Sequence, residues 1–140
     1  MDYFKRINDE YGHLGGDAAL RAVGEALADE FRGHAAVGRF GGEEFVALVP
    51  GVEAETASGV GERVRRRIES LRITSDVITS AEPLTVTASI GVAVTGTHGD
   101  TLDELLHAAD RALYVAKDAG RNAVRLAALP QAVTKATDAA

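Results

Sequence analysis

The feature that most constrains the fold is a pair of β-prone runs separated by two glycines. Residues Ala35–Phe40 and Glu43–Val49 flank Gly41 and Gly42. This arrangement predicts an antiparallel hairpin, because glycine adopts the backbone conformations that tight turns between strands require. Pro50 and Gly51 end the second run. The centre of the chain is therefore predicted to be a two-stranded unit.

Apolar residues at helical spacing predict helices on both sides of this hairpin. The four expected helices span about residues 3–13, 17–33, 54–71 and 101–117. Asp2 is expected to cap the first helix, and Gly12 with the pair Gly15-Gly16 is expected to break it before the second begins at Asp17. Gly120 is a natural cap for the end of the last helix.

Two further strands complete the predicted elements. Leu84–Val94 alternates well enough for a long strand, residues 95–99 supply a turn, and Asn122–Leu126 reads as a short final strand. Together the elements predict an α+β fold, a two-layer sandwich in which helices cover a mainly antiparallel sheet. Beyond Pro130 the chain is rich in Ala and Thr without periodicity, so a frayed tail is expected there.

Composition excludes several classes of function. The 140 residues fit one domain, and the absence of cysteine removes disulfide scaffolds, thiolate zinc sites and cysteine nucleophiles. A net charge of −6 argues against a general nucleic-acid binder, and the basic run Arg63–Arg67 is interpreted as a solvated helix face. No apolar stretch is long enough to span a membrane, and no signal peptide is visible. The chain itself is therefore predicted to be soluble, although a parent protein could be membrane-anchored.

The strongest chemical signal is the segment Arg39-Phe-Gly-Gly-Glu-Glu-Phe45. Its two glycines allow a ligand to approach the backbone closely, and its two adjacent carboxylates suit Mg²⁺, which takes carboxylates together with substrate phosphates. The competing interpretation is an ordinary hairpin whose glutamates are solvated.

Further blocks accompany this segment in a fixed order. They are residues 2–9 (DYFKRIND), Tyr11-Gly-His13, Gly16-Asp17, Ser89-Ile-Gly91, residues 109–117 (ADRALYVAK) and Gly120-Arg-Asn122. In order and spacing these blocks resemble the signature stretches of GGDEF-domain diguanylate cyclases, with Gly41–Phe45 matching the GGEEF variant. The resemblance covers residues 1–126 and leaves residues 127–140 as a flexible tail. It implies a nucleotidyl-cyclase-like fold and a domain located in the cytoplasm.

The resemblance implies a role for each matched residue. Glu43 would bind the catalytic metals and help to deprotonate the attacking 3′-hydroxyl, with Glu44 in the same metal and phosphate environment. Asn8 and Asp17 would read the guanine base by hydrogen bonds. The remaining substrate-binding positions are Lys5, Lys117 and Arg121, which would hold the triphosphate, and Gly41 and Gly42, which would let the nucleotide approach the backbone.

Simpler interpretations of these residues stay open at this point. Asn8 could lie on a helix surface, and Asp17 could merely cap the second helix. Lys117 and Arg121 sit at the end of a helix, where cations suit its dipole. His13 is interpreted as a turn residue, and Tyr114 as a packing residue.

The implied reaction condenses two GTP molecules into cyclic di-GMP and releases pyrophosphate, with Mg²⁺ or Mn²⁺ as cofactor. Each domain would bind one GTP, so a homodimer is expected for catalysis. The resemblance also implies an upstream sensory or receiver domain in the parent protein. Neither nucleic acid nor a membrane is expected as a partner of this domain.

The sequence departs from the family pattern at its beginning. The family's first strand, with a metal-binding Asp, would precede Met1, and Met1 falls where the family uses a backbone carbonyl as a metal ligand. Little cyclase activity is therefore expected from the 140 residues, and more from a longer parent. The alternative is a catalytically inactive module that binds GTP or cyclic di-GMP, and a purely structural dimerisation domain is the third possibility.

The second departure lies at the product-inhibition site of the family. Where the family often places Arg-x-x-Asp, this chain has Arg32-Gly-His-Ala35, so the Asp is lost. Arg63 matches a secondary arginine of the same site. Feedback inhibition through Arg32 and Arg63 is therefore expected to be weak or absent.

Overall fold

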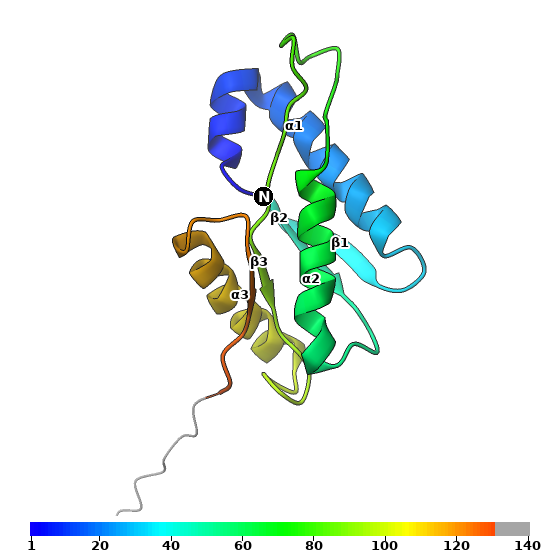
Figure 1. Ribbon diagram of the computed structural model, residues 1–140, viewed down its shortest axis with the longest axis vertical. Coiled ribbons are helices and arrows are strands. Elements are labelled where there is room, and N and C mark those ends of the chain that lie inside the picture. Colours follow the sequence, from blue (N-terminus) through cyan, green and yellow to red (C-terminus); the bar gives the residue numbers. More distant parts are fainter. Residues whose placement is uncertain (131–140) are drawn as a thin grey trace, which may run out of the picture.

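The computed structural model describes residues 1–130 and contains three helices and four strands, shown in Figure 1. In chain order the elements are α1 (Phe4–Glu30), β1 (Ala36–Gly41), β2 (Glu44–Leu48), α2 (Ala54–Glu69), β3 (Ile90–Val92), α3 (Leu102–Asp118) and β4 (Val124–Leu126). The prediction of an α+β fold is confirmed. Within residues 1–130, no helix has both the length and the apolar character that crossing a membrane requires.

Helix α1 replaces the two separate helices expected from the sequence. Its only non-helical residue is Gly12 (φ 72°, ψ 172°), where the helix bends sharply (Figure 1). The expectation of a further break at Gly15 and Gly16 was wrong: both are buried within the helix. A Cβ on Gly15 would overlap the Cβ of Tyr11, and one on Gly16 would overlap the side chain of Asn8. These glycines therefore let the two arms of α1 pack closely at the bend.

The hairpin formed by β1 and β2 is confirmed, and its pairing is antiparallel. The register joins Ala36 to Leu48 and Arg39 to Phe45, and an irregularity follows before Gly41 pairs with Glu44. Gly42 adopts a left-handed conformation (φ 41°), and its carbonyl accepts a 2.8 Å hydrogen bond from Nε of Arg39. The turn before Glu44 is thus fixed by a glycine and a local side-chain contact.

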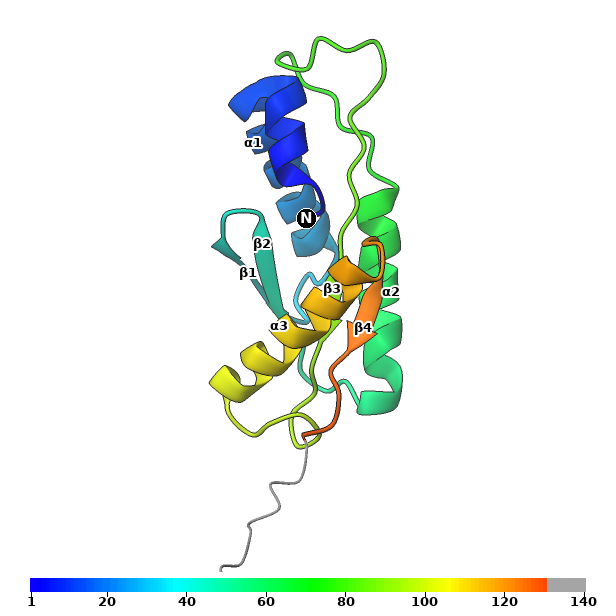
Figure 2. The same ribbon diagram turned by 90° about the vertical axis from the view of Figure 1, so that its left-hand side faces the viewer.

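Strands β3 and β4 pair in parallel, which the expectation of a mainly antiparallel sheet did not include. This pair lies between α3 and α2 (Figure 2). A Cβ on Gly91 would overlap the backbone of α3 at Ala109, whereas one on Gly61 of α2 would lie 2.8 Å from Val124. Glycines on both sides therefore allow helix and strand backbones to approach closely.

The long strand expected at Leu84–Val94 is present only in part. Residues 90–92 form β3, and Leu84 makes an isolated bridge to Ile73. The alternation is still visible in burial, because Leu84, Val86 and Ala88 all lie in the core. Most of this segment lacks a neighbouring strand, so its backbone cannot complete a ladder.

The main core lies between α1, α2 and the segment that leads into β3. Its buried members are Ile7, Ala19, Val23, Leu27, Phe31, Val64, Ile68, Ile73, Leu84, Val86 and Ala88. A smaller cluster joins Ala108 and Ala112 of α3 to Ala127. The N–H of Ala127 donates to the carbonyl of Val92 at 2.7 Å. Most of the tail expected at 127–140 falls outside the described residues.

Helix α3 begins with a capping box. The hydroxyl of Thr101 accepts from the N–H of Glu104 at 3.3 Å, and the Glu104 carboxylate accepts from the N–H groups of Asp100 (2.9 Å) and Thr101 (3.1 Å). These bonds satisfy backbone donors that a helix start leaves without partners. The backbone hydrogen bonds from Asp100 and Thr101 also lower the pKa of Glu104.

Replacing Thr101 with alanine is expected to lower the free energy of unfolding by about 1 kcal/mol, because one capping acceptor is lost. Chemical denaturation at pH 7 measures this difference. Thr56→Ala is the matched control, since the Thr56 hydroxyl only donates to the Glu53 carbonyl on an exposed turn. Equal stabilities of Thr101→Ala and the unmodified chain would contradict the capping role.

Candidate functional site

The acidic pair lies at the tip of the hairpin, beside the start of the chain. Glu43 is half-buried in the turn and Glu44 is the first, exposed residue of β2. The amino group of Met1 donates a 2.8 Å hydrogen bond to the carbonyl of Glu43. The turn therefore presents two carboxylates next to a main-chain segment that is remote in sequence.

Further charges converge on the same place. Burial lowers the pKa of the Met1 amino group, as does the positive charge of Lys117, while the carboxylates of Asp2, Glu43 and Glu44 act in the opposite direction. Lys117 is half-buried in the last turn of α3, and it lines the same cavity as Met1 and Glu44. The fold thus brings the acidic pair and one of the expected phosphate-binding cations together.

Asn8 and Asp17 lie on the two arms of α1, on either side of its bend at Gly12. Oδ1 of Asn8 is buried and has no hydrogen-bond partner within the described part of the chain. It packs against Gly16, directly before Asp17. Asp17 is exposed, and it lines a small hollow of about 370 Å³ together with Leu20, Arg21, Arg39 and Phe45.

This geometry bears on the simpler interpretations that the sequence left open for these two residues, while their role in base recognition stays a prediction. Asp17 lies inside α1 and cannot be its N-cap, and the buried, unpaired oxygen of Asn8 is not that of an ordinary surface residue. A buried acceptor without a partner is costly, and among the described residues Asn8 is the side chain that carries one.

Arg121 lies just after α3, where its guanidinium carbon is 4.6 Å from the centre of the Tyr3 ring. Tyr3 is two residues from Met1, so Arg121 is near the start of the chain as well. Lys5 is exposed on the first turn of α1, and no hydrogen bond or ion pair between described residues ties it to the other site residues. Gly41 and Gly42 border open space on the hairpin.

The sequence analysis assigned Asp2 the wrong role. Helix α1 begins at Phe4 after Tyr3, and no side chain caps it. The buried carboxylate of Asp2 instead accepts hydrogen bonds from Ser89 Oγ (2.7 Å), Thr87 Oγ1 (2.8 Å) and the N–H of Asn122 (3.0 Å). Burial raises the pKa of Asp2, but these hydrogen bonds and the Met1 charge outweigh it, so the pKa lies below its usual value. Its hydrogen-bond partners lie 85 to 120 residues away in the sequence, so no local sequence pattern predicts them.

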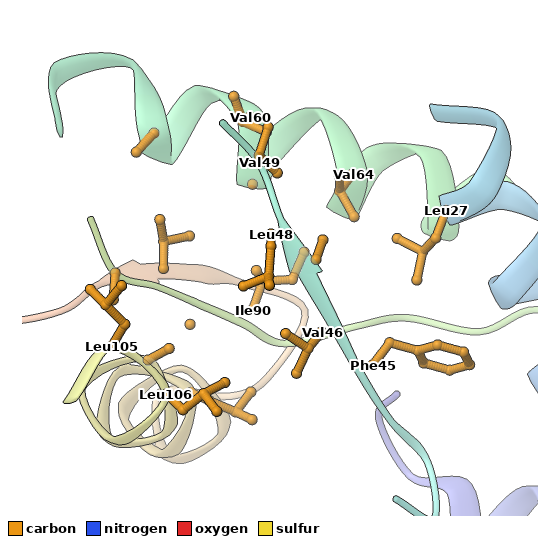
Figure 3. A pocket seen from close by; sticks show the side chains of 18 of the residues that line it. Leu27, Phe45, Val46, Leu48, Val49, Val60, Val64, Ile90, Leu105 and Leu106 are labelled. Carbon is orange, nitrogen blue, oxygen red and sulfur yellow. The ribbon is translucent and has the colours of Figure 1, made fainter. Parts of the chain in front are cut away.

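An apolar groove of about 770 Å³ lies between β2 and β3. Figure 3 shows the side chains that line it, among them Phe45, Val46 and Leu48 of β2, Val60 and Val64 of α2, Ile90 of β3, and Leu105 and Leu106 of α3. Among residues 1–130, each strand is paired on one side only, so two free strand edges border the groove. At its end, Met1 bonds to the Glu43 carbonyl and the N–H of Asp2 donates to Thr87 at 2.9 Å. The first two residues thus bridge both walls.

The arginines matched to the inhibitory site lie at the far end of α1. Arg32 forms an ion pair with Asp29, and Arg63 of α2 forms one with Glu30. Both guanidinium groups are thus already matched with carboxylates of this chain. That arrangement is compatible with the expected weakness of product binding, which stays a prediction.

The residues present fit a divalent metal that binds together with nucleotide phosphates. Residues 1–130 contain no group of three or more His, Cys, Asp or Glu side chains that would form a metal site by themselves. Glu43 and Glu44 supply two carboxylates, and Mg²⁺ commonly binds one or two carboxylates and completes its shell with phosphates and water. Met1 lies beside this turn through its amino group, and the expected ligand role of its backbone carbonyl stays a prediction.

Comparison with known proteins agrees with this geometry. Residues 1–123 match the family described as "Diguanylate cyclase, GGDEF domain". Response regulator PleD of Caulobacter vibrioides is 43% identical over 124 residues, which are 89% of this chain and 27% of PleD. Diguanylate cyclase VdcA of Vibrio cholerae is 41% identical over 89% of this chain and 36% of its own length.

Solved structures give the same result. The GGDEF domain of PA1120 (YfiN or TpbB) from Pseudomonas aeruginosa superposes with a TM-score of 0.80 at 32% identity, covering 92% of this chain and 78% of that one. The GGDEF domain of DgcB from Caulobacter crescentus, solved in complex with c-di-GMP, has a TM-score of 0.79 at 30% identity, with coverage of 89% and 72%.

This chain therefore belongs to the GGDEF family of diguanylate cyclase domains. Its fold is that of the GGDEF domains, and the family links it to cyclic di-GMP signalling. The chain spans only about a quarter to a third of the curated relatives it matches, 27% of PleD and 36% of VdcA.

Proposed function

We propose that this chain binds one GTP and forms half of a diguanylate cyclase active site, which two copies complete face to face. The 3′-oxygen of each GTP attacks the α-phosphorus of the other. Each attack releases pyrophosphate and one proton from the hydroxyl, and two attacks close the ring of cyclic di-GMP. The observation that carries the proposal is that Glu43, Glu44, Lys117 and Arg121 all lie near the first three residues of the chain.

The proposed roles follow the chemistry of each group. The side-chain amide of Asn8 hydrogen-bonds the guanine base, and the carboxylate of Asp17 accepts hydrogen bonds from its N–H groups. Lys5, Lys117 and Arg121 neutralise the triphosphate, for which guanidinium and ammonium groups are suited. Gly41 and Gly42 leave the hairpin tip open to the nucleotide.

Glu43 and Glu44, with the carbonyl of Met1, are proposed to hold Mg²⁺ or Mn²⁺. A metal bound there would lower the pKa of the 3′-hydroxyl and stabilise charge that develops on the phosphates. Glu43 accepts the hydroxyl proton. Supporting residues fix this geometry before substrate binds, as the Arg39 contact to the turn illustrates.

A module that binds the nucleotide without turning it over is the second candidate. The observation that favours it is the small number of candidate metal ligands, since the described residues supply two carboxylates at the turn and no third. Its ligand would be GTP or cyclic di-GMP. Turnover of GTP into cyclic di-GMP separates the two candidates, because only the cyclase forms product.

We further propose that this domain lies in the cytoplasm as part of a longer protein. A sensory or receiver domain of that protein is proposed to supply its signal. PleD is named a response regulator, and SiaD of Pseudomonas aeruginosa is solved in complex with its activator SiaC. Those names concern the relatives. For this chain they support an attached or separate regulator.

Calorimetric titration tests the nucleotide site without requiring turnover. With Mg²⁺ present, GTP is expected to bind, and ATP is expected to bind at least about tenfold more weakly. The reason is that adenine lacks the N1–H and 2-amino donors that guanine offers to Asn8 and Asp17. Asp17→Asn should remove much of this preference, while Asp9→Asn, on the exposed side of α1, should not. Equal affinity for GTP and ATP would contradict the assignment.

Gly16→Ala is expected to weaken GTP binding by about tenfold or more, since the added methyl overlaps Asn8 Oδ1 and lies 3.1 Å from the Phe4 ring. Titration with GTP measures the change. Gly59→Ala is the matched control, because a Cβ on that exposed residue of α2 meets no atom within 4 Å. Unchanged affinity in a folded Gly16→Ala protein would place the guanine elsewhere.

A further inference from the structure

Residues with left-handed backbone conformations lie where the first residues of the chain meet the end of α3. Among residues 1–130, positive φ outside glycine occurs at three positions: Tyr3 (53°), Arg121 (66°) and Asn122 (43°). Such conformations persist only where the surrounding structure holds them, and they concentrate at functional sites. Here two of the three residues contact each other, since the Arg121 guanidinium stacks on the Tyr3 ring at 4.6 Å.

The carboxylate of Asp2 holds the turn that contains Arg121. Its Oδ2 accepts from the N–H of Asn122 at 3.0 Å and from Thr87 Oγ1 at 2.8 Å. A second bond fixes the turn to α3, because the N–H of Arg121 donates to the Ala116 carbonyl at 3.0 Å. The backbone on both sides of the Arg121 Cα is therefore fixed.

The side chain of Asn122 completes this support on the other side. It donates from Nδ2 to Glu69 Oε1 at 2.7 Å and accepts from Arg65 Nη1 at 2.8 Å, so α2 also holds the turn. Arg121, in contrast, forms no ion pair with a carboxylate in the described part of the chain. Its position is fixed by an aromatic ring and by its backbone, and its charge stays available to a ligand.

We infer that Asp2 and Tyr3 are positioning residues for nucleotide binding, with Asp2 fixing the Arg121-Asn122 turn and Tyr3 aiming the guanidinium at the triphosphate. The inference rests on the proposed GTP site and assigns it two residues that touch neither metal nor substrate. A cation–π contact uses none of the guanidinium N–H groups as donors to an acceptor atom, so those of Arg121 are left for phosphate oxygens.

The test compares GTP with guanosine, which has no phosphates, by titration of the 140-residue chain with Mg²⁺. Tyr3→Ala is expected to weaken GTP binding by about two- to fivefold, the range of an exposed cation–π contact, and to leave guanosine binding unchanged. Tyr3→Phe, which keeps the ring face, should restore the affinity for GTP. Tyr114→Ala on α3 is the control, because Tyr114 is an exposed tyrosine, and among the described residues the ring that Arg121 contacts is that of Tyr3.

A double-mutant cycle separates positioning from structural damage. On an Arg121→Ala background, Tyr3→Ala should have no further effect on GTP binding, because the group that it aims is gone. Asp2→Asn should also weaken GTP more than guanosine and should increase hydrogen exchange at the Asn122 amide. Additive losses in the cycle, or equal losses for GTP and guanosine, overturn the inference. Failure of the folded, unmodified chain to bind GTP would overturn the proposed function as well.

Discussion

A longer protein in which an apolar strand precedes Met1 is expected to form cyclic di-GMP from GTP at least about tenfold faster than the 140-residue chain. The reason is that a strand filling the apolar groove raises the fraction of molecules in the binding-competent arrangement. The groove of about 770 Å³ is lined by apolar side chains, and among the described residues β2 and β3 each have an edge without a strand partner. Met1 and Asp2 each make a backbone hydrogen bond, to Glu43 next to β2 and to Thr87 in the segment before β3, so a strand that precedes Met1 would enter the groove between them.

The same strand is expected to raise the free energy of unfolding by on the order of 3 kcal/mol or more, since each aliphatic side chain that it buries contributes about 1.5–3 kcal/mol. Denaturant titration measures stability, and chromatography of the GTP reaction measures product. The matched control is an extension of equal length with two central prolines, which cannot complete the ladder. If both extensions leave stability and product formation unchanged, the groove does not accept a strand.

Glu43→Gln is expected to reduce the rate of cyclic di-GMP formation by at least about a hundredfold in that extended protein, because the neutral amide loses both the metal-binding charge and the proton acceptor. GTP binding without metal should change little, since the base and most of the phosphate contacts remain. Glu44→Gln is expected to have the smaller effect, because its carboxylate is proposed to bind metal without accepting the proton.

One titration and one control make this prediction specific. The rate of product formation against Mg²⁺ concentration should show a higher Mg²⁺ requirement in both variants, and a loss at saturating Mg²⁺ only in Glu43→Gln. Glu53→Gln is the control, because Glu53 is exposed at the start of α2 and away from the hairpin tip. A Glu43→Gln protein with near-normal turnover would remove the catalytic role of the acidic pair.

The elements that the sequence predicted correctly are those with local signals. The hairpin follows from two β-prone runs around Gly41 and Gly42, and α2 and α3 follow from apolar residues spaced by three and four. Local rules misled at Gly15 and Gly16, because their role is to let the two arms of α1 approach, which depends on the side chains of Tyr11 and Asn8. Spacing alone does not contain that information.

The incomplete strand at 84–94 has a similar cause. Its alternation correctly marks which side chains face the core, but strand pairing also needs a neighbour on the other edge. The groove occupies that position. The parallel pairing of β3 with β4 was likewise decided by tertiary packing between α2 and α3.

For the candidate site, residue types and spacing predicted the charged groups, while the contacts that surround them came only from the structure. Glu43, Glu44 and Lys117 were predicted from the sequence; in the structure Met1 bonds to the Glu43 carbonyl and lines one groove with Glu44 and Lys117. The hydrogen bonds from Ser89, Thr87 and Asn122 to Asp2 join segments far apart in the chain, so no window of sequence shows them.

The arrangement of the metal, the phosphates and the guanine base is tested most directly by a crystal structure of the chain with Mn²⁺ and 3′-deoxy-GTP, which lacks the attacking hydroxyl and so cannot condense. The anomalous signal of Mn²⁺ should lie between the carboxylates of Glu43 and Glu44 and the nucleotide phosphates, with guanine against Asn8 and Asp17. A nucleotide bound elsewhere, for example only beside Arg32 and Arg63, with no metal at the hairpin tip, would contradict the proposed active site.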